Sequence, residues 1–165
     1  MLMKTIRIKA LNQENFAPFG EVIEATEQCE SYFINEGNCR RYHNLAKVEA
    51  KGENAKAIIS IFRAKPISLP FELKMMERHP FGSQSFMPLS PSQFLVIVAK
   101  NENGKPASLQ AFLANIGQGV NIDINVWHAP LCALKMETDF FVVDRDGAEN
   151  NLETYDFENP YRIEK

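Results

Sequence analysis

This sequence has no surplus of positive charge, few cysteines and no long apolar run. Its 165 residues carry a formal net charge of −3, so a nucleic-acid partner is not expected, because nucleic-acid binding needs a basic surface. No apolar segment approaches the roughly 20 residues of a membrane-spanning helix. The stretch MLMKTIRIKA also lacks the apolar core of a signal peptide. These absences favour a protein without nucleic-acid or membrane partners.

Cysteine is scarce and unpaired. Cys29, Cys39 and Cys132 make an odd number and show no C-x-x-C spacing. We expect them to be reduced thiols, as is typical of a cytoplasmic protein. Histidine is equally scarce, with three residues in the chain, so the position of each one bears on where chemistry takes place.

The chain is rich in short apolar runs separated by turn residues, as in KGEN, SPSQ and NENGKP. Runs of this kind, with many Ile, Val, Leu and Phe residues, are typical of β-strands rather than of independent helices. They occupy residues 5–8, 57–62, 71–76, 94–99, 109–113, 131–136 and 140–143. This pattern predicts a single, mainly β domain over residues 1–165, folded as a sandwich or a barrel.

Two segments depart from the pattern. The stretch NQENFAPFG predicts one short helix, with Asn12 as its N-cap and with Pro18 and Gly20 ending it. The C-terminal stretch ENNLETYDFENPYRIEK is polar, and we expect it to lie over the surface.

The candidate site begins in the stretch ERHPFGSQ, where ionisable residues and turn residues precede an apolar run. Side chains alternate along a strand, so Glu77 and His79 should point to one face and Arg78 to the other. Farther along, GQGVNIDINVWHAP contains His128. The spacing of Glu77, His79 and Gln84, and the spacing that leads to His128, resemble in part the two motifs of the cupin superfamily.

A closer resemblance covers most of the chain. Six blocks resemble, in order, those of the ureidoglycolate lyase family: FINEG, RRYHNLA, SIFRAKP, ERHPFGSQSFMPL, NVWHAPL and DFFVVDRDG. The resemblance implies a cupin-type jelly-roll β-barrel with a few short helices, usually a homodimer. It also implies an enzyme of allantoin breakdown in purine catabolism that splits ureidoglycolate into glyoxylate and urea. The resemblance allows a divalent metal ion, with nickel the ion usually named, and implies no organic cofactor.

The sequence departs from the family pattern beside His128. Where the family often has Tyr-His-Arg, this chain has Ile122, Asp123 and Ile124, and Ala129 replaces a second histidine. Phe62 also stands where the family often has Asn. These differences are compatible with an altered substrate preference or a weaker metal site.

Cleavage of ureidoglycolate requires a base for the hydroxyl proton, an acid for the departing urea nitrogen and a cation for the carboxylate. We assign the proton transfers to His79, His128 and Glu77, because histidine titrates near neutrality and burial raises the pKa of a carboxyl group. Glu77, His79, Gln84 and His128 also offer nitrogen and oxygen ligands to a divalent ion.

The substrate is a small anion, so the pocket should contain an arginine. The candidates for substrate binding are Arg41, Arg63, Arg145, His43 and Gln84, with Arg63 or Arg41 favoured as the carboxylate anchor and Arg78 in reserve. Ordinary salt bridges explain the arginines equally well, and a structural role explains His43 equally well. Arg145, for example, stands next to Asp144 and can pair with it in a turn.

Two other functions fit the same residues. One is an ureidoglycolate amidohydrolase that releases ammonia instead of urea. The other is a non-catalytic cupin that binds a small acid. The products released from ureidoglycolate distinguish all three.

Overall fold

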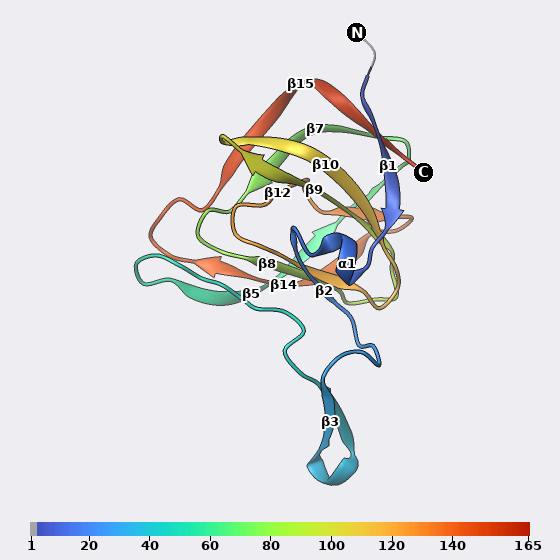
Figure 1. Cartoon of the computed structure of the whole chain (residues 1–165), viewed down its shortest axis with the longest axis vertical. Coiled ribbons are helices and arrows are strands. Elements are labelled where there is room, and N and C mark those ends of the chain that lie inside the picture. The colour runs from blue at the N-terminus through green and yellow to red at the C-terminus, as the bar shows by residue number, and fades with distance from the viewer. Residues whose placement is uncertain (1–2) are drawn as a thin grey trace.

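The computed structural model describes residues 3–165, and its regular structure is almost entirely β-strand (Figure 1). In this range the helical elements are α1 (Gln13–Phe16) and the short 3-10 helix η1 (Asn35–Gly37). The predicted N-cap is confirmed: the Asn12 side chain accepts a hydrogen bond from the Asn15 amide, and the Asn15 side chain accepts one from Asn12.

Two sheets make up the body of the protein. The larger contains, in spatial order, β10 (Lys105–Ala114), β1 (Thr5–Ala10), β15 (Glu153–Glu164), β7 (Phe71–Arg78), β12 (Trp127–His128), β9 (Phe94–Glu102), β13 (Cys132–Leu134) and β6 (Pro66–Ile67). The smaller contains β2 (Gly20–Ile23), β11 (Gly119–Ile122), β8 (Gln84–Pro88), β14 (Thr138–Asp146) and β5 (Lys56–Ala64).

The larger sheet closes on itself, because β10 pairs with β1 on one side and with β9 on the other. Closure removes free strand edges, which would otherwise pair with other chains. The prediction of a mainly β barrel is therefore confirmed. Among residues 3–165, no helix is long and apolar enough to cross a membrane.

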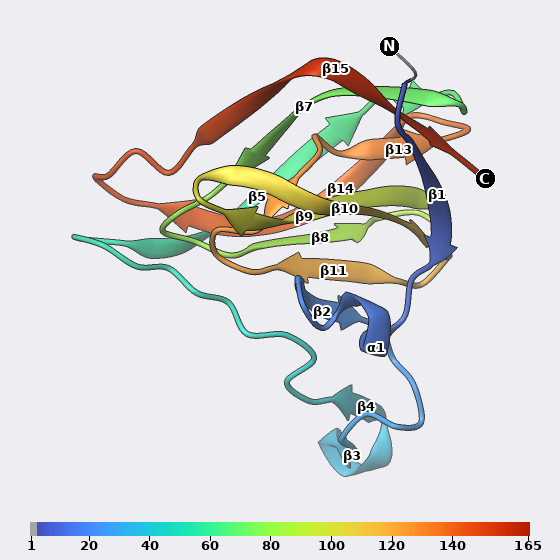
Figure 2. The same cartoon turned by 45° about the horizontal axis from the view of Figure 1, so that its top comes forward.

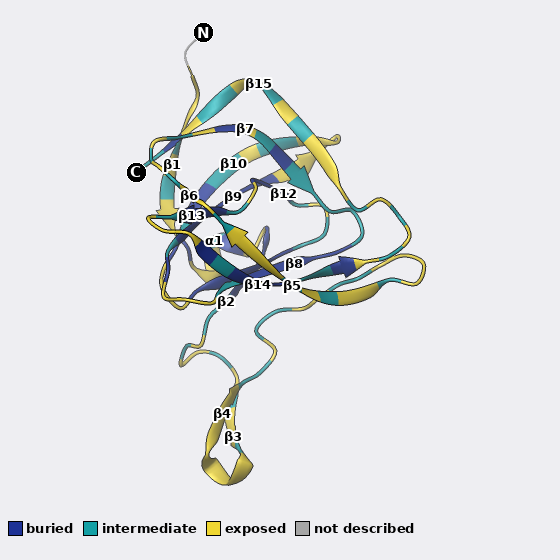
Figure 3. Ribbon diagram, turned by 180° about the vertical axis from the view of Figure 1, so that it is seen from behind, coloured by how far each residue is buried: buried dark blue, intermediate teal, exposed yellow. Residues whose placement is uncertain are grey.

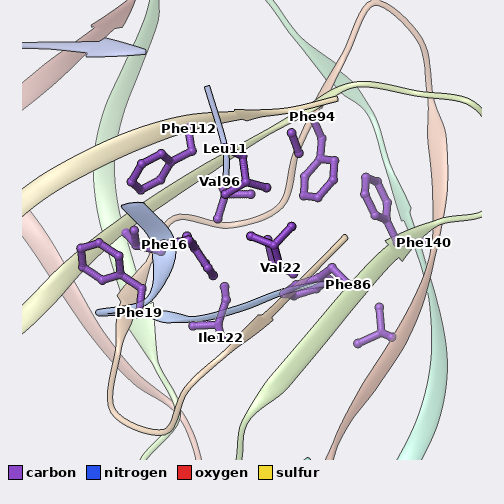
Figure 4. Close-up of a cluster of buried hydrophobic side chains, with 14 of the residues drawn as sticks. Leu11, Phe16, Phe19, Val22, Phe86, Phe94, Val96, Phe112, Ile122 and Phe140 are labelled. Atoms are coloured by element: carbon purple, nitrogen blue, oxygen red, sulfur yellow. The ribbon is translucent and has the colours of Figure 1, made fainter. Parts of the chain in front are cut away.

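The barrel is filled by two groups of apolar side chains. The first lies between the two sheets and includes five fully buried phenylalanines. Figure 4 shows Phe16, Phe19 and Phe112 grouped on one side of it and Phe94 and Phe140 on the other. The second gathers side chains from the strands of the closed sheet, among them Leu73, Met76, Ile97, Trp127 and Ile163. Both groups stabilise the strand ends that carry the polar residues described below.

The expectation for the C-terminal stretch is wrong in one respect. Residues 153–164 form β15, which pairs with β7 along one edge and with β1 along the other, and Ile163 is completely buried. The polar composition reflects the side chains of the outward face, whereas backbone hydrogen bonds to two neighbouring strands hold the segment in the sheet.

One element stands apart from the barrel. Within residues 3–165, β3 (Ser31–Ile34) and β4 (Cys39–Tyr42) pair only with each other, and the hairpin they form extends away from the body (Figures 1 and 2). Most of its residues are exposed, as the yellow colouring of Figure 3 shows. We call residues 31–43 the arm.

Candidate active site

The candidate site forms where β7 ends beside β12. His128 of β12 is paired directly with Glu77 of β7, and His79 follows β7 by one residue. The ring centroids of His79 and His128 lie 5.1 Å apart. The predicted approach of the two imidazoles is confirmed, and two strands far apart in the sequence bring them together.

The tautomers of both histidines follow from their hydrogen bonds. Nδ1 of His79 lies 2.7 Å from the Asn151 carbonyl oxygen, and Nδ1 of His128 lies 3.2 Å from that of Val126. Because a carbonyl only accepts, each Nδ1 must carry the hydrogen. In its neutral form each ring presents the lone pair of its Nε2, whereas the Nε2 of His128 interacts favourably with the Glu77 carboxylate only in the form that carries a proton. Both Nε2 atoms are buried and have no hydrogen-bond partner among the described residues.

A carboxylate completes the cluster. Oε1 of Glu77 lies 3.5 Å from Nε2 of His128, and one ligand atom from each of Glu77, His79 and His128 lies within 4.8 Å of the other two. The buried Gln84 places an Oε1 atom that also lacks a hydrogen-bond partner in the described chain. Four polar groups thus lie in one small region, and the hydrogen bonds among them do not use all of their donors and acceptors.

This arrangement fits a divalent metal ion. Nitrogen and oxygen ligands lie about 2.0–2.2 Å from such an ion. Small movements of these side chains would bring their ligand atoms to that distance from a shared ion. Histidine ligands typically donate their other ring N–H to a backbone carbonyl, as His79 and His128 both do. Two buried Nε2 atoms without hydrogen-bond partners are also expected of a pair of histidines that binds a metal ion.

A cavity of about 380 Å³ opens beside the cluster. It is lined by Phe62, Glu77, His79, Ser83, Gln84, Asp144, Arg145, Asn151 and Leu152. A smaller cavity of about 200 Å³, lined by strands of both sheets, also touches Phe62, Glu77 and His128, and its other lining residues are mostly apolar. We call the larger cavity the mouth of the barrel.

Asp144 belongs to this mouth and was not included in the predicted site. On β14, Phe140 and Val142 face the core, so Asp144 faces inward by the same alternation. Its Oδ1 atom is buried and has no hydrogen-bond partner in the described chain. The sequence shows the positions that alternate, but the run FFVV is apolar on both faces of the strand. It therefore does not indicate which face points inward.

The environment shifts the pKa values of three acidic or basic groups at the mouth. Interaction with the His128 imidazole lowers the pKa of Glu77, although its partial burial opposes this effect. Burial lowers the pKa of His79, and the neighbouring His128 lowers it further. Burial raises the pKa of Asp144. Glu77 is therefore held ionised and His79 neutral, which are the forms that bind a cation.

The structure places three predicted arginines away from the cluster or in fixed contacts. Arg63 lies exposed on the outer face of β5 and donates two hydrogen bonds to Asp139. Arg78 points away from Glu77, as predicted, and pairs with Glu153 while its guanidinium lies over the ring of Trp127.

Arg145 lines the mouth, but its side chain is engaged elsewhere. Its guanidinium donates to the carbonyls of Lys51 and Glu149, pairs with the Glu149 carboxylate, and lies over the Phe81 ring. Its Nη atoms therefore already have partners. We assign Arg145 a structural role.

Arg41 and His43 lie on the arm, not at the mouth of their own barrel. The guanidinium of Arg41 lies 6.0 Å from the centre of the Tyr32 ring, and the His43 ring lies 5.9 Å from the same ring. The structure therefore brings together Glu77, His79, Gln84 and His128, and separates them from Arg41, Arg63 and His43.

Together, a closed β-barrel and a partly buried cluster of two histidines and a carboxylate define a barrel protein with a candidate site for metal binding or acid–base chemistry. The sequence profile of the ureidoglycolate lyase family matches residues 3–164. Relatives named ureidoglycolate lyase include those of Brucella anthropi, 52% identical over 99% of this chain and 97% of its own, and of Rhizobium etli, 52% identical over 96% and 95%. The chain belongs to the ureidoglycolate lyase family.

A more distant likeness concerns the fold alone. The crystal structure of a dTDP-sugar isomerase from Desulfovibrio desulfuricans covers 86% of this chain, with a TM-score of 0.50 and 11% identity. That similarity supports the barrel architecture and carries nothing about the substrate.

Proposed function

We propose that this protein is a ureidoglycolate lyase that releases glyoxylate and urea in the breakdown of allantoin. The observation that carries the proposal is the convergence of Glu77, His79 and His128 between two cavities, one lined by Glu77 and His79 and the other by Glu77 and His128, in a chain that matches the family over nearly its whole length.

The reaction breaks one carbon–nitrogen bond. A base takes the proton of the substrate hydroxyl, the C–O bond becomes a carbonyl, and the electron pair of the C–N bond moves to the urea nitrogen. A proton delivered to that nitrogen completes the urea, and glyoxylate remains. No net proton and no oxidant or water is consumed, so the protein needs only to position groups that move one proton.

We propose that Glu77, His79 and His128, with Gln84 beside them, hold a divalent metal ion, with nickel as the first ion to test. Such an ion would supply Lewis acidity, which lowers the pKa of a hydroxyl group bound to it. Calorimetric titration of the purified protein with Ni²⁺ tests this directly. Binding should be lost in His128→Ala and kept in Arg63→Ala, whose guanidinium lies on the outer face of the sheet.

In this arrangement Asp144 moves the proton. Its buried Oδ1 faces the mouth without a partner in the described chain, and its pKa is raised, so it can accept the hydroxyl proton and return it to the urea nitrogen. The earlier assignment of proton transfer to His79, His128 and Glu77 stays a prediction. Full activity after complete removal of metal would favour that assignment over the metal site.

The product assay separates the candidate functions. Incubation with ureidoglycolate should yield glyoxylate and urea in equal amounts with no ammonium. Ammonium as the nitrogen product would indicate an amidohydrolase. Binding of ureidoglycolate without turnover would indicate a small-acid-binding cupin.

We further propose a cytoplasmic homodimer. The three cysteines form no disulfide, which agrees with a reducing compartment. Support for the dimer comes from exposed apolar side chains on the arm and the outer sheet face, which are considered next.

A further inference from the structure

Among the described residues that line the mouth, the arginine is Arg145, whose guanidinium is already engaged by Lys51 and Glu149. Among residues 3–165, every arginine other than Arg41 has a hydrogen bond or ion pair within the chain: Arg7, Arg40, Arg63, Arg78, Arg145 and Arg162. Charged side chains near the cluster are mostly carboxylates, Glu77 and Asp144. A substrate anion placed there requires a positive group from elsewhere.

The arm carries Arg41, the arginine without such a partner among residues 3–165. Tyr32 of β3 is paired with Arg41 of β4, so the two side chains share one face of the hairpin. The Tyr32 ring lies 6.0 Å from the Arg41 guanidinium and 5.9 Å from the His43 ring. Nδ1 of His43 is buried and has no hydrogen-bond partner in the described chain. This face of the arm therefore holds a free guanidinium and an unsatisfied imidazole.

Within residues 3–165, the strands of the arm form no β-pairing with the barrel. Isolated two-stranded hairpins are marginally stable in water. The arm nevertheless exposes large apolar groups, with Phe33 64% and Tyr32 41% exposed. A hairpin with these features is expected to be covered by another surface.

A second copy of the chain offers that surface. The outer face of the smaller sheet exposes Ile59, Ile61 and Phe141, with Ile59 and Ile61 69% and 54% exposed. Contiguous exposed apolar side chains of this size are unusual on monomers and mark interaction sites. Two-fold symmetry makes the exchange reciprocal, since each arm that crosses to a partner is matched by the partner's arm crossing back.

We propose that the protein forms a two-fold dimer in which the arm of one copy lies across the outer sheet face of the other and delivers Arg41 to the mouth of that barrel. There Arg41 binds the substrate carboxylate, and His43 assists from the same face. The inference rests on the proposed function for the identity of the anion. It explains how a mouth whose arginine is already engaged obtains an anchor, and why the arm projects from the barrel.

Single substitutions test the role of Arg41. Arg41→Ala should raise KM for ureidoglycolate about 10- to 100-fold, as expected for the loss of a charged hydrogen-bonded pair, with a smaller effect on kcat. Arg162→Ala is the matched control, because Arg162 lies on β15, outside the arm and the smaller sheet, and pairs with Glu164. It should leave KM unchanged. Equal KM values for wild type and Arg41→Ala would overturn the assignment.

Mixed dimers test whether the arm acts in the partner's site. Arg41→Ala and His128→Ala chains, carrying different tags, are co-expressed and the mixed dimer is purified. It holds one site with an intact barrel and an intact arm, so at substrate concentrations below KM it should recover about half of the wild-type rate per dimer. A rate no higher than the mean of the two parent variants would overturn the proposal.

Sedimentation gives a result that does not depend on catalysis. The wild type should be a dimer, and Phe33→Ser and Ile61→Ser should each weaken it. A monomeric wild type at micromolar concentration would overturn the proposal whatever its activity. If these variants weaken the dimer but the wild type does not act on ureidoglycolate, the proposed function and the anchor role of Arg41 are wrong. The arm interface would still be supported in that case.

Discussion

Arg145→Met should destabilise the protein while leaving its affinity for substrate intact. The guanidinium donates to the Lys51 carbonyl at 2.8 Å and to the Glu149 carbonyl at 3.1 Å, and it lies over the Phe81 ring. Its side chain is 1% exposed, so water cannot replace these partners. Three glycines pack so closely against Arg145 and its partner Glu149 that an added Cβ would collide with them: Gly52, Gly82 and Gly147.

The expected loss follows from those contacts. Each hydrogen bond from a charged donor contributes about 1.5–3 kcal/mol, and the contact with the Phe81 ring adds about 0.5–1 kcal/mol. Methionine retains the apolar stem, so we expect a net loss of about 3–5 kcal/mol in the free energy of unfolding. For a chain of this length that corresponds to a fall in Tm of about 6–20 °C.

Calorimetry gives Tm, and initial rates measured well below Tm give KM. Arg63→Met is the control, because its exposed ion pair with Asp139 should contribute little to stability. An unchanged Tm together with a tenfold rise in KM for Arg145→Met would show that Arg145 binds the substrate and that its structural assignment is wrong.

Three further predictions concern stability. Burial and the charges of Glu21 and Glu49 raise the pKa of Asp123, so its ionisation opposes folding as the pH rises through its folded pKa. Asp123→Asn should therefore be more stable than wild type in urea at pH 7. The difference in stability should disappear below about pH 4, the ordinary pKa of Asp. Equal stability of the two proteins at pH 7 would contradict this prediction. Asn12→Ala removes the cap of α1 and should cost about 1 kcal/mol in the same assay, an effect that Asn12→Ser should largely avoid. Phe140→Ala, in the fully buried core, should cost about 3–5 kcal/mol, and a loss under about 1 kcal/mol would mean that the core there is poorly packed.

The part of the site that was predictable depends on local strand geometry. Alternation along β7 placed Glu77 and His79 on one side and Arg78 on the other, and the structure agrees. The position of His128 beside Glu77 required only that its segment be a neighbouring strand. Period-two patterns and motif spacing carry this information because they involve few residues at a time.

The remaining parts depend on contacts that are distant in the sequence. Nothing local shows that the carbonyl of Asn151 orients His79, or that Glu149 and Lys51 occupy the guanidinium of Arg145. The C-terminal strand was missed for the same reason, since its place between β7 and β1 comes from backbone pairing and not from apolar content. The single-domain organisation stays a prediction.

The central claim is that ureidoglycolate is cleaved at the cluster at the barrel mouth. The most direct test is to measure kcat for His79→Ala, His128→Ala and the double variant. Each single variant should lower kcat about 100-fold or more while keeping the circular dichroism spectrum of the wild type. The double variant should be little slower than the slower single variant, because groups that act as one unit have non-additive effects. Urea release at near wild-type rates from both folded single variants would contradict the account.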